Sequence, residues 1–104
     1  MTGLRIAWKE EFNFKIEIIC AILVIALGII IDITKTEFLI IVLTIGSVLT
    51  TEALNTALEE LCDKFEPSHD PHIAKIKDLA AAAVLIVSFC AAIIGIVIFA
   101  PYFL

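Results

Sequence analysis

The sequence predicts an all-α integral membrane protein with three membrane-spanning helices and an amphipathic interfacial helix at its N-terminus. Two observations support this prediction: an unusually apolar composition and three long runs without a charged residue. Of the 104 residues, 62% are hydrophobic and 18% are charged, whereas a soluble domain is about 45–50% apolar. A water-soluble chain of this length buries too little surface to hide so much apolar material. We therefore treat residues 1–104 as a single membrane domain.

The three uncharged runs define the predicted spans. The longest run, 79–104, has 26 residues, more than the roughly 20 that cross a bilayer as a helix. The run 38–51 has 14 residues, and it reaches 21 if the helix continues past two polar residues to Leu58. The run 18–31 also has 14, and we interpret it as a span because the other two leave no soluble core for it to join. The predicted spans are 18–33, 38–58 and 79–104.

The basic residues predict the orientation of the chain. Three precede the first span and three lie in the polar segment 59–78, whereas the first connection holds only Lys35 and the C-terminal end holds none. Cytoplasmic loops of membrane proteins carry the excess of lysine and arginine. We therefore expect the N-terminus and residues 59–78 in the cytoplasm, and the C-terminus outside.

Residues 3–17 have the pattern of an interfacial helix that leads into the first span. Leu4, Trp8 and Phe12 follow one another at four-residue spacing and form an apolar stripe. A lipid-surface anchor would explain this stripe. It would not explain Glu11, an acid next to the stripe.

The segment 59–78 is the longest polar stretch. Pro67 and Pro71 interrupt any helix there, and we expect helix to resume near His72. His69 and His72 lack partner cysteines, so a turn is favoured over a metal site.

The net charge of −5 argues against a nucleic-acid partner, which would require a basic face.

A polar stripe at the cytoplasmic end of the second predicted span is the strongest indication of chemistry. Glu52, Asn55, Thr56 and Glu59 lie at positions i, i+3, i+4 and i+7, so they share one helical face. A charged residue at mid-bilayer costs about 2.5–3.5 kcal/mol on insertion scales, and less near an interface. Hydrogen bonds between helices would explain the asparagine and the threonine. They explain the two carboxylates poorly.

Helix geometry separates the two glutamates of the stripe. Glu52 and Glu59 are about 10.5 Å apart along the axis, whereas magnesium binds oxygen at about 2.0–2.1 Å. One ion therefore cannot bind both. Glu59, nearer the cytoplasm, is the better ligand, with Glu11 as a second carboxylate from the first segment. Glu52 is deeper and suits a general base.

Lys77 and Asp78 lie where the third span enters the membrane. Lysine at this place is equally explained as a phosphate-binding charge or as a flanking residue that reaches the interface.

The four glycines form no nucleotide-binding loop of the familiar kinds. The residues alone leave a metal-assisted reaction and a proton-coupled transporter open, with Glu52 as the proton carrier of the transporter. A structural membrane subunit is the third alternative.

The stretches "EALNTALEELCD" and "KIKDLAAAAVLI" resemble the small bacterial membrane lipid kinases, the family of prokaryotic diacylglycerol kinase and undecaprenol kinase. The family's hallmark is matched by Glu52, Leu54, Asn55, Thr56, Ala57, Leu58, Glu59 and Asp63. The stretch "GLRIAWKEEFNFKIE" is similar to the family's first segment, with matches at Gly3, Leu4, Arg5, Ala7, Trp8, Glu11, Phe14 and Glu17. The resemblance covers nearly the whole chain.

The resemblance implies a homotrimeric helical bundle of the bacterial plasma membrane with composite sites. Its reaction would be phosphoryl transfer from ATP, with Mg²⁺ as cofactor, to the hydroxyl of a membrane lipid. Glu52 would be the catalytic base, and Glu52 and Glu17 would lie on the lipid side. Glu11 and Glu59 would hold the metal and, with it, the nucleotide.

The resemblance also implies further nucleotide-binding residues, namely Asn55, Lys77 and Asp78. The family's loop often has a histidine before the proline, where this chain has Asp70. Contacts of Ser68, His69 and Asp70 with the nucleotide are therefore the least supported of the expected contacts.

Two features point to different lipid acceptors. Glu17 follows the diacylglycerol kinase pattern, whereas Asn13 and Pro101 are similar to the undecaprenol branch. We expect diacylglycerol as the acceptor, giving phosphatidic acid. Undecaprenol, giving undecaprenyl phosphate, is the alternative.

Overall fold

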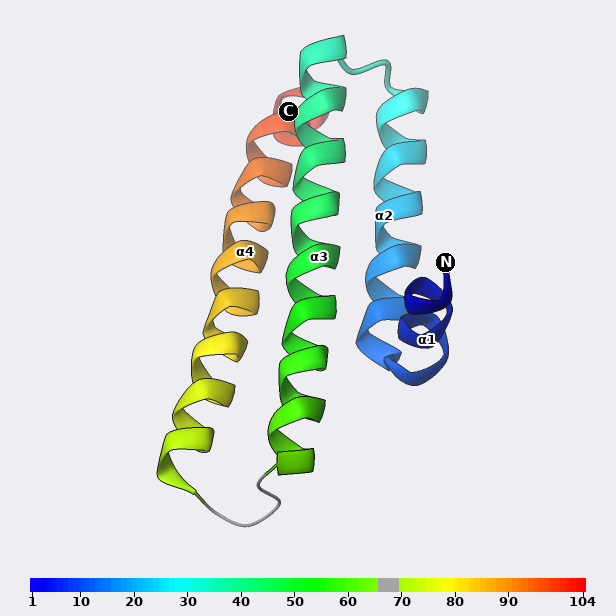
Figure 1. Ribbon diagram of the computed structural model, residues 1–104. Helices are drawn as coiled ribbons and strands as arrows, with labels where there is room; N and C mark the ends of the chain where they lie inside the picture. The colour runs from blue at the N-terminus through cyan, green and yellow to red at the C-terminus, as the bar shows by residue number, and fades with distance from the viewer. Residues whose placement is uncertain (66–69) are drawn as a thin grey trace.

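The computed structural model describes residues 1–65 and 70–104, which form four helices (Figure 1). They are α1 (Thr2–Glu10), α2 (Phe12–Ile30), α3 (Lys35–Phe65) and α4 (Pro71–Phe103). The long helices α2, α3 and α4 lie side by side, with α3 in the middle, and the short α1 lies beside the first turns of α2 (Figure 1).

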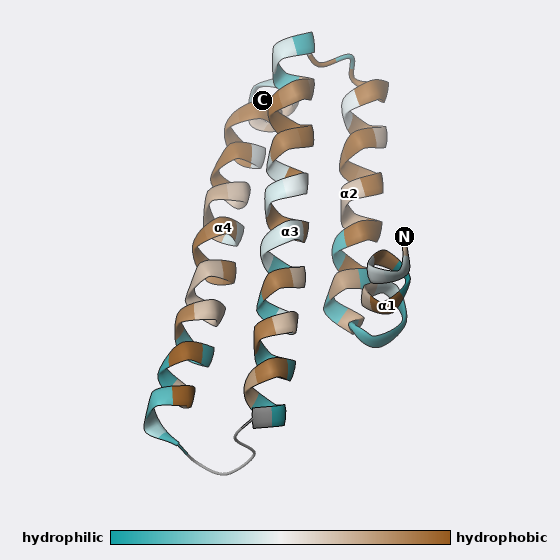
Figure 2. Cartoon of the chain, viewed as in Figure 1, coloured by the Kyte–Doolittle hydropathy of each residue, from teal (hydrophilic) through white to brown (hydrophobic). Residues whose placement is uncertain are grey.

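Most of the apolar surface of this bundle faces outward. Within the described residues, the buried apolar side chains are Phe14, Ile41, Cys62 and Ile98. Hydrophobic residues dominate most of α2 and α4 and the first turns of α3, the middle of α3 is of intermediate hydropathy, and hydrophilic residues gather around α1 and the connected ends of α3 and α4 (Figure 2). By length and composition, α2, α3 and α4 can each cross a membrane. The predicted all-α membrane class with three spanning helices is confirmed.

Helix α3 is longer than the apolar layer that it crosses. Its 31 residues extend about 46 Å at 1.5 Å per residue, whereas the hydrocarbon core of a bilayer is about 30 Å thick. Its last turns therefore carry polar side chains beyond the hydrocarbon.

The predicted interfacial helix 3–17 is two helices in the structure. The chain bends at Glu11, whose backbone is extended (φ −110°, ψ 102°), and α2 begins directly after it. A straight helix would carry the charged residues of α1 into the same environment as the apolar α2, and the bend separates the two. The Lys15 ammonium lies 5.8 Å from the centre of the Trp8 ring, a cation–π contact across the bend.

The connection between α2 and α3 is short and closed by side chains. Asp32 has a positive φ of 58°, a conformation that a short polar residue tolerates better than most. The Glu37 amide donates to Thr34 Oγ1 (3.1 Å), and the Thr34 amide donates to Glu37 Oε1 (2.9 Å). This reciprocal pair is a capping box. The Tyr102 hydroxyl also donates to Glu37 Oε1, which ties the end of α4 to the start of α3.

Much of the polar segment 59–78 is helical. Its first residues belong to α3, and α4 begins at Pro71, one residue before the expected position. Proline suits the first position of a helix because it lacks the amide hydrogen that would be unpaired there. The Asp70 carboxylate caps the helix by accepting a hydrogen bond from the His72 amide (2.8 Å). Pro67, Ser68 and His69 lie outside the described residues.

Replacing Tyr102 with phenylalanine should weaken the packing of α3 and α4 near the C-terminus. The change removes the hydroxyl that donates to Glu37 and keeps the ring. We expect the thermal unfolding midpoint in detergent, followed by circular dichroism, to fall by about 2–5 °C. Phe103→Leu, a change at the neighbouring exposed aromatic, is the control and should leave the midpoint near that of the wild type. An equal midpoint for Tyr102→Phe and wild type would contradict the role given to this bond.

Candidate active site

Glu52 is the buried polar centre of the structure. Its side chain is only 5% exposed although it belongs to a spanning helix. The carboxyl group of Glu17, on α2, lies next to it. Glu17 Oε2 is buried and has no hydrogen-bond partner among the described residues.

A second contact joins α3 to the bend between α1 and α2. The Thr56 hydroxyl donates to Glu11 Oε2 at 2.9 Å, in a partly buried position. Because Glu11 occupies the bend itself, this bond fixes the place where the chain passes from α1 to α2. Thr56 follows Glu52 by four residues, so Glu11 and Glu17 both contact one face of α3.

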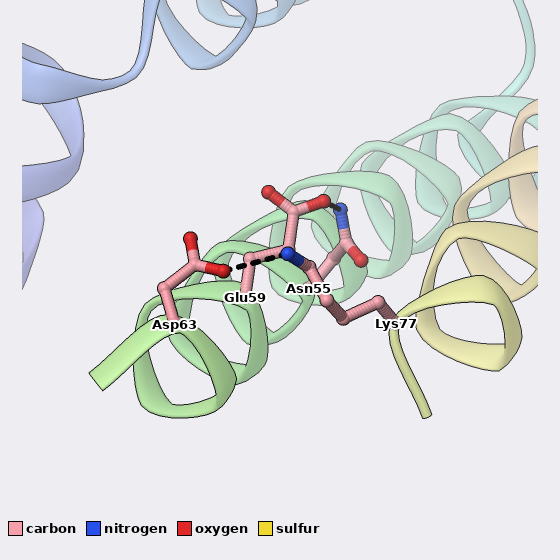
Figure 3. Close-up of polar contacts among 4 residues, drawn as sticks. All are labelled: Asn55, Glu59, Asp63 and Lys77. Carbon is pink, nitrogen blue, oxygen red and sulfur yellow. Dashed lines mark hydrogen bonds and ion pairs between the residues drawn. The ribbon is translucent and has the colours of Figure 1, made fainter. Parts of the chain in front are cut away.

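The side of α3 that faces α4 carries a second polar group (Figure 3). We call Asn55, Glu59 and Asp63 the α3 ladder, since they follow one another at four-residue spacing. Asn55 Nδ2 lies 3.5 Å from Glu59 Oε1, the longest hydrogen bond of the site. The Lys77 ammonium of α4 donates to Asp63 Oδ1 at 2.6 Å. Asn55 Oδ1 is buried without a partner in the part of the chain that the structure describes.

The structure thus divides the predicted site residues between two sides of α3. Glu11, Glu17 and Glu52 meet on the α2 side, and Asn55, Glu59 and Lys77 meet on the α4 side. The remaining predicted residues are in neither group: Asp78 is exposed beside Lys77, Asp70 caps α4, and Ser68 and His69 lie outside the described residues.

The sequence did not predict that Asp63 would pair with Lys77. Its position on the face of Glu59 was readable from helical spacing. Its partner lies 14 residues further along the chain, on another helix, and periodicity within one helix cannot identify such a partner.

The carboxylates of Glu11 and Glu59 are hydrogen-bonded to adjacent residues of α3, Thr56 and Asn55. In residues 1–65 and 70–104, no group of three or more His, Cys, Asp or Glu side chains gathers around one point. Magnesium needs no such group when it arrives with a nucleotide, because phosphates and water complete a shell begun by one or two carboxylates. Glu11 and Glu59 lie on different sides of α3, so within this chain each would offer such an ion a single carboxylate.

An apolar cavity of about 250 Å³ lies between α2, α3 and α4. Glu17 is the only carboxylate of the described residues at its wall. The apolar and small residues of the wall include Val24 on α2, Val48 on α3, and Ala91 and Gly95 on α4. The cavity therefore joins an apolar volume within the membrane to the carboxyl pair of Glu17 and Glu52.

Replacing Thr56 with valine should loosen the packing of α1 and the bend on α3. Valine has nearly the same shape but leaves Glu11 Oε2 without its donor. We expect the backbone amides of α1 to exchange with deuterium about tenfold faster, because a hydrogen bond to a charged group is lost. The control is Thr51→Val, since the Thr51 hydroxyl bonds only within its own helix, to the Ser47 carbonyl at 2.7 Å. Unchanged exchange of α1 in Thr56→Val would contradict the importance of this bond.

Comparison with known proteins agrees with this geometry. The family model described as prokaryotic diacylglycerol kinase matches residues 1–99. The chain is 36% identical to the undecaprenol kinase of Bacillus subtilis, over 89% of this chain and 76% of the relative. It is 29% identical to the diacylglycerol kinase of Escherichia coli, over 88% and 75%, and 31% identical to that of Haemophilus influenzae, over 93% and 80%. The chain therefore belongs to the prokaryotic diacylglycerol kinase family of membrane lipid kinases.

Proposed function

We propose that this protein transfers the γ-phosphate of Mg-ATP to the hydroxyl group of a membrane lipid alcohol. The observation that carries the proposal is the buried Glu52, which lies next to Glu17, the carboxyl group at the wall of an apolar cavity. A lipid alcohol has an apolar chain next to a hydroxyl group, and the cavity and the carboxyl pair match these two parts. Family membership supports the use of ATP.

Glu52 acts as the general base in this proposal. Its carboxylate accepts the proton of the lipid hydroxyl as the hydroxyl oxygen attacks the γ-phosphorus, and the new oxygen–phosphorus bond replaces the bond to ADP. Glu17 lies next to Glu52 and at the wall of the cavity, so its carboxyl group is placed to orient the lipid hydroxyl toward the base. Positioned proton transfer of this kind contributes about 10²–10⁴ to a rate.

The nucleotide lies on the cytoplasmic side of the base. Phosphoryl transfer depends mainly on positioning and on neutralising charge, and a metal ion bound to ATP would supply much of that neutralisation. Glu11 and Glu59 would each offer the metal–nucleotide complex a carboxylate, Lys77 would give its ammonium to a phosphate, and Asn55 and Asp78 would bind the nucleotide. The unpartnered Oδ1 of Asn55 supports a polar contact with a ligand.

We also propose a bacterial plasma membrane location, with the N-terminus and the α3 ladder in the cytoplasm and the C-terminus outside. The distribution of basic residues supports this orientation, and so does the need for cytoplasmic ATP to reach Lys77. A homotrimer is proposed from the resemblance to the family. The large outward-facing apolar surface leaves room for such packing.

Undecaprenol is the acceptor that we propose first. The chain is 36% identical to an undecaprenol kinase, against 29% and 31% for two diacylglycerol kinases over similar shares of this chain. This order reverses the one expected from the sequence, where Glu17 favoured diacylglycerol. Diacylglycerol stays as the second candidate because Glu17 contacts the proposed base directly.

Replacing Glu52 with glutamine should abolish most phosphoryl transfer. Glutamine keeps the size of the side chain but cannot take the proton, so we expect kcat to fall by about 10²–10⁴. The measurement is transfer of label from Mg-ATP to lipid by purified protein in mixed micelles. Glu60→Gln, at an exposed acid on the same helix, is the control and should keep wild-type activity. A Glu52→Gln variant with near-normal kcat would remove Glu52 from the role of base.

The acceptor is identified by offering undecaprenol and diacylglycerol in parallel micelles, with Glu52→Gln as the blank. We expect a higher kcat/KM with undecaprenol, measured as label in undecaprenyl phosphate. Label mainly in phosphatidic acid would reverse this order and assign diacylglycerol. Folded wild-type protein that labels neither lipid would contradict the kinase and return the buried glutamates to proton-coupled transport.

A further inference from the structure

Asp63 has no role in the mechanism proposed above, yet it makes the one ion pair found within the described residues. Its Oδ1 lies 2.6 Å from the Lys77 ammonium, and the pair joins α3 to α4 near the cytoplasmic ends of both helices (Figure 3). Lys77 is 37% exposed and Asp63 is 66% exposed. Exposed pairs of this kind add little to stability, so the value of the pair to the protein lies elsewhere.

The position of the pair relates it to the nucleotide. Asp63 follows Glu59 by four residues and lies about 6 Å further along the helix axis. Figure 3 shows Lys77 reaching from α4 across to the ladder, toward both Glu59 and Asp63. A lysine without a partner would spread its ammonium over many side-chain conformations, because its four-carbon stem is flexible.

We propose that Asp63 is a positioning residue that holds the Lys77 ammonium beside Glu59, ready for the phosphates of Mg-ATP. An ammonium has three hydrogen-bond donors. Asp63 takes one of them and leaves two for phosphate oxygens. This inference rests on the proposed kinase function and adds to it a carboxylate that does not itself touch the substrate.

The competing explanation is that the pair only braces α3 against α4. A brace predicts lower thermal stability without Asp63 and an unchanged affinity for nucleotide. A further possibility is that Asp63 competes with phosphate for the ammonium, which predicts tighter nucleotide binding in its absence. Positioning predicts the opposite, a loss of nucleotide affinity.

The test compares Asp63→Asn with wild type at varied Mg-ATP and then at varied lipid. We expect the KM for Mg-ATP to rise about three- to tenfold, as for the loss of one partly exposed positioning contact. The KM for lipid and the unfolding midpoint should stay near wild-type values, and Asp63→Glu, which keeps the carboxylate, should recover most of the nucleotide affinity. The matched control is Glu60→Gln, at an exposed acid on α3 that is outside the ladder.

A second pair of variants shows whether Asp63 acts through Lys77. In a Lys77→Met background, Asp63→Asn should raise the KM for Mg-ATP no further, because the ammonium that it positions is gone. An unchanged or lowered KM in Asp63→Asn alone, or a full additional rise in the Lys77→Met background, would overturn the positioning role. If wild type transfers phosphate and Asp63→Asn behaves like it, only this inference fails. If folded wild type transfers none, the kinase proposal fails and takes the inference with it.

Discussion

The requirement that a buried carboxylate find a polar partner governs this structure. Glu52 lies in a helix that crosses lipid, where an isolated charge is expensive. Its partner, Glu17, can reach it only if α2 packs closely on α3. The turn between these helices is short, with the Ile33 amide donating to the Gly28 carbonyl at 3.1 Å, and it keeps the two helices adjacent.

The division of the chain between two environments follows from the length of α3. Its first half is an ordinary apolar span, and its second half carries polar side chains that meet α2, the bend at Glu11 and α4 in turn. Lipid covers the apolar part, which explains how a folded chain can have so few buried side chains. The chemistry is concentrated where the helix leaves the hydrocarbon, the level at which a lipid hydroxyl and a soluble nucleotide can meet.

The sequence predicted the features that depend on local periodicity. The three spans follow from runs and spacings within single helices. The expectation that Glu52, Asn55 and Glu59 share one face is corrected, because Glu52 lies against Glu17 of α2 whereas Asn55 and Glu59 lie on the side that faces α4. The bend at Glu11 was not predicted, because residues 4–17 continue the helical period without a proline or glycine to mark a break. Two pairings were also not predicted: Thr56 with Glu11, and Asp63 with Lys77. They depend on how helices far apart in the chain pack together.

The unequal packing of the three long helices has a mechanical consequence. Helix α4 packs on α3 more extensively than α2 does. Helices α3 and α4 therefore move as one body. Helix α2 is held to that body by its carboxyl contact and by a short turn. The cavity between the three helices is therefore easiest to widen on the α2 side, by a swing about the turn at Asp32.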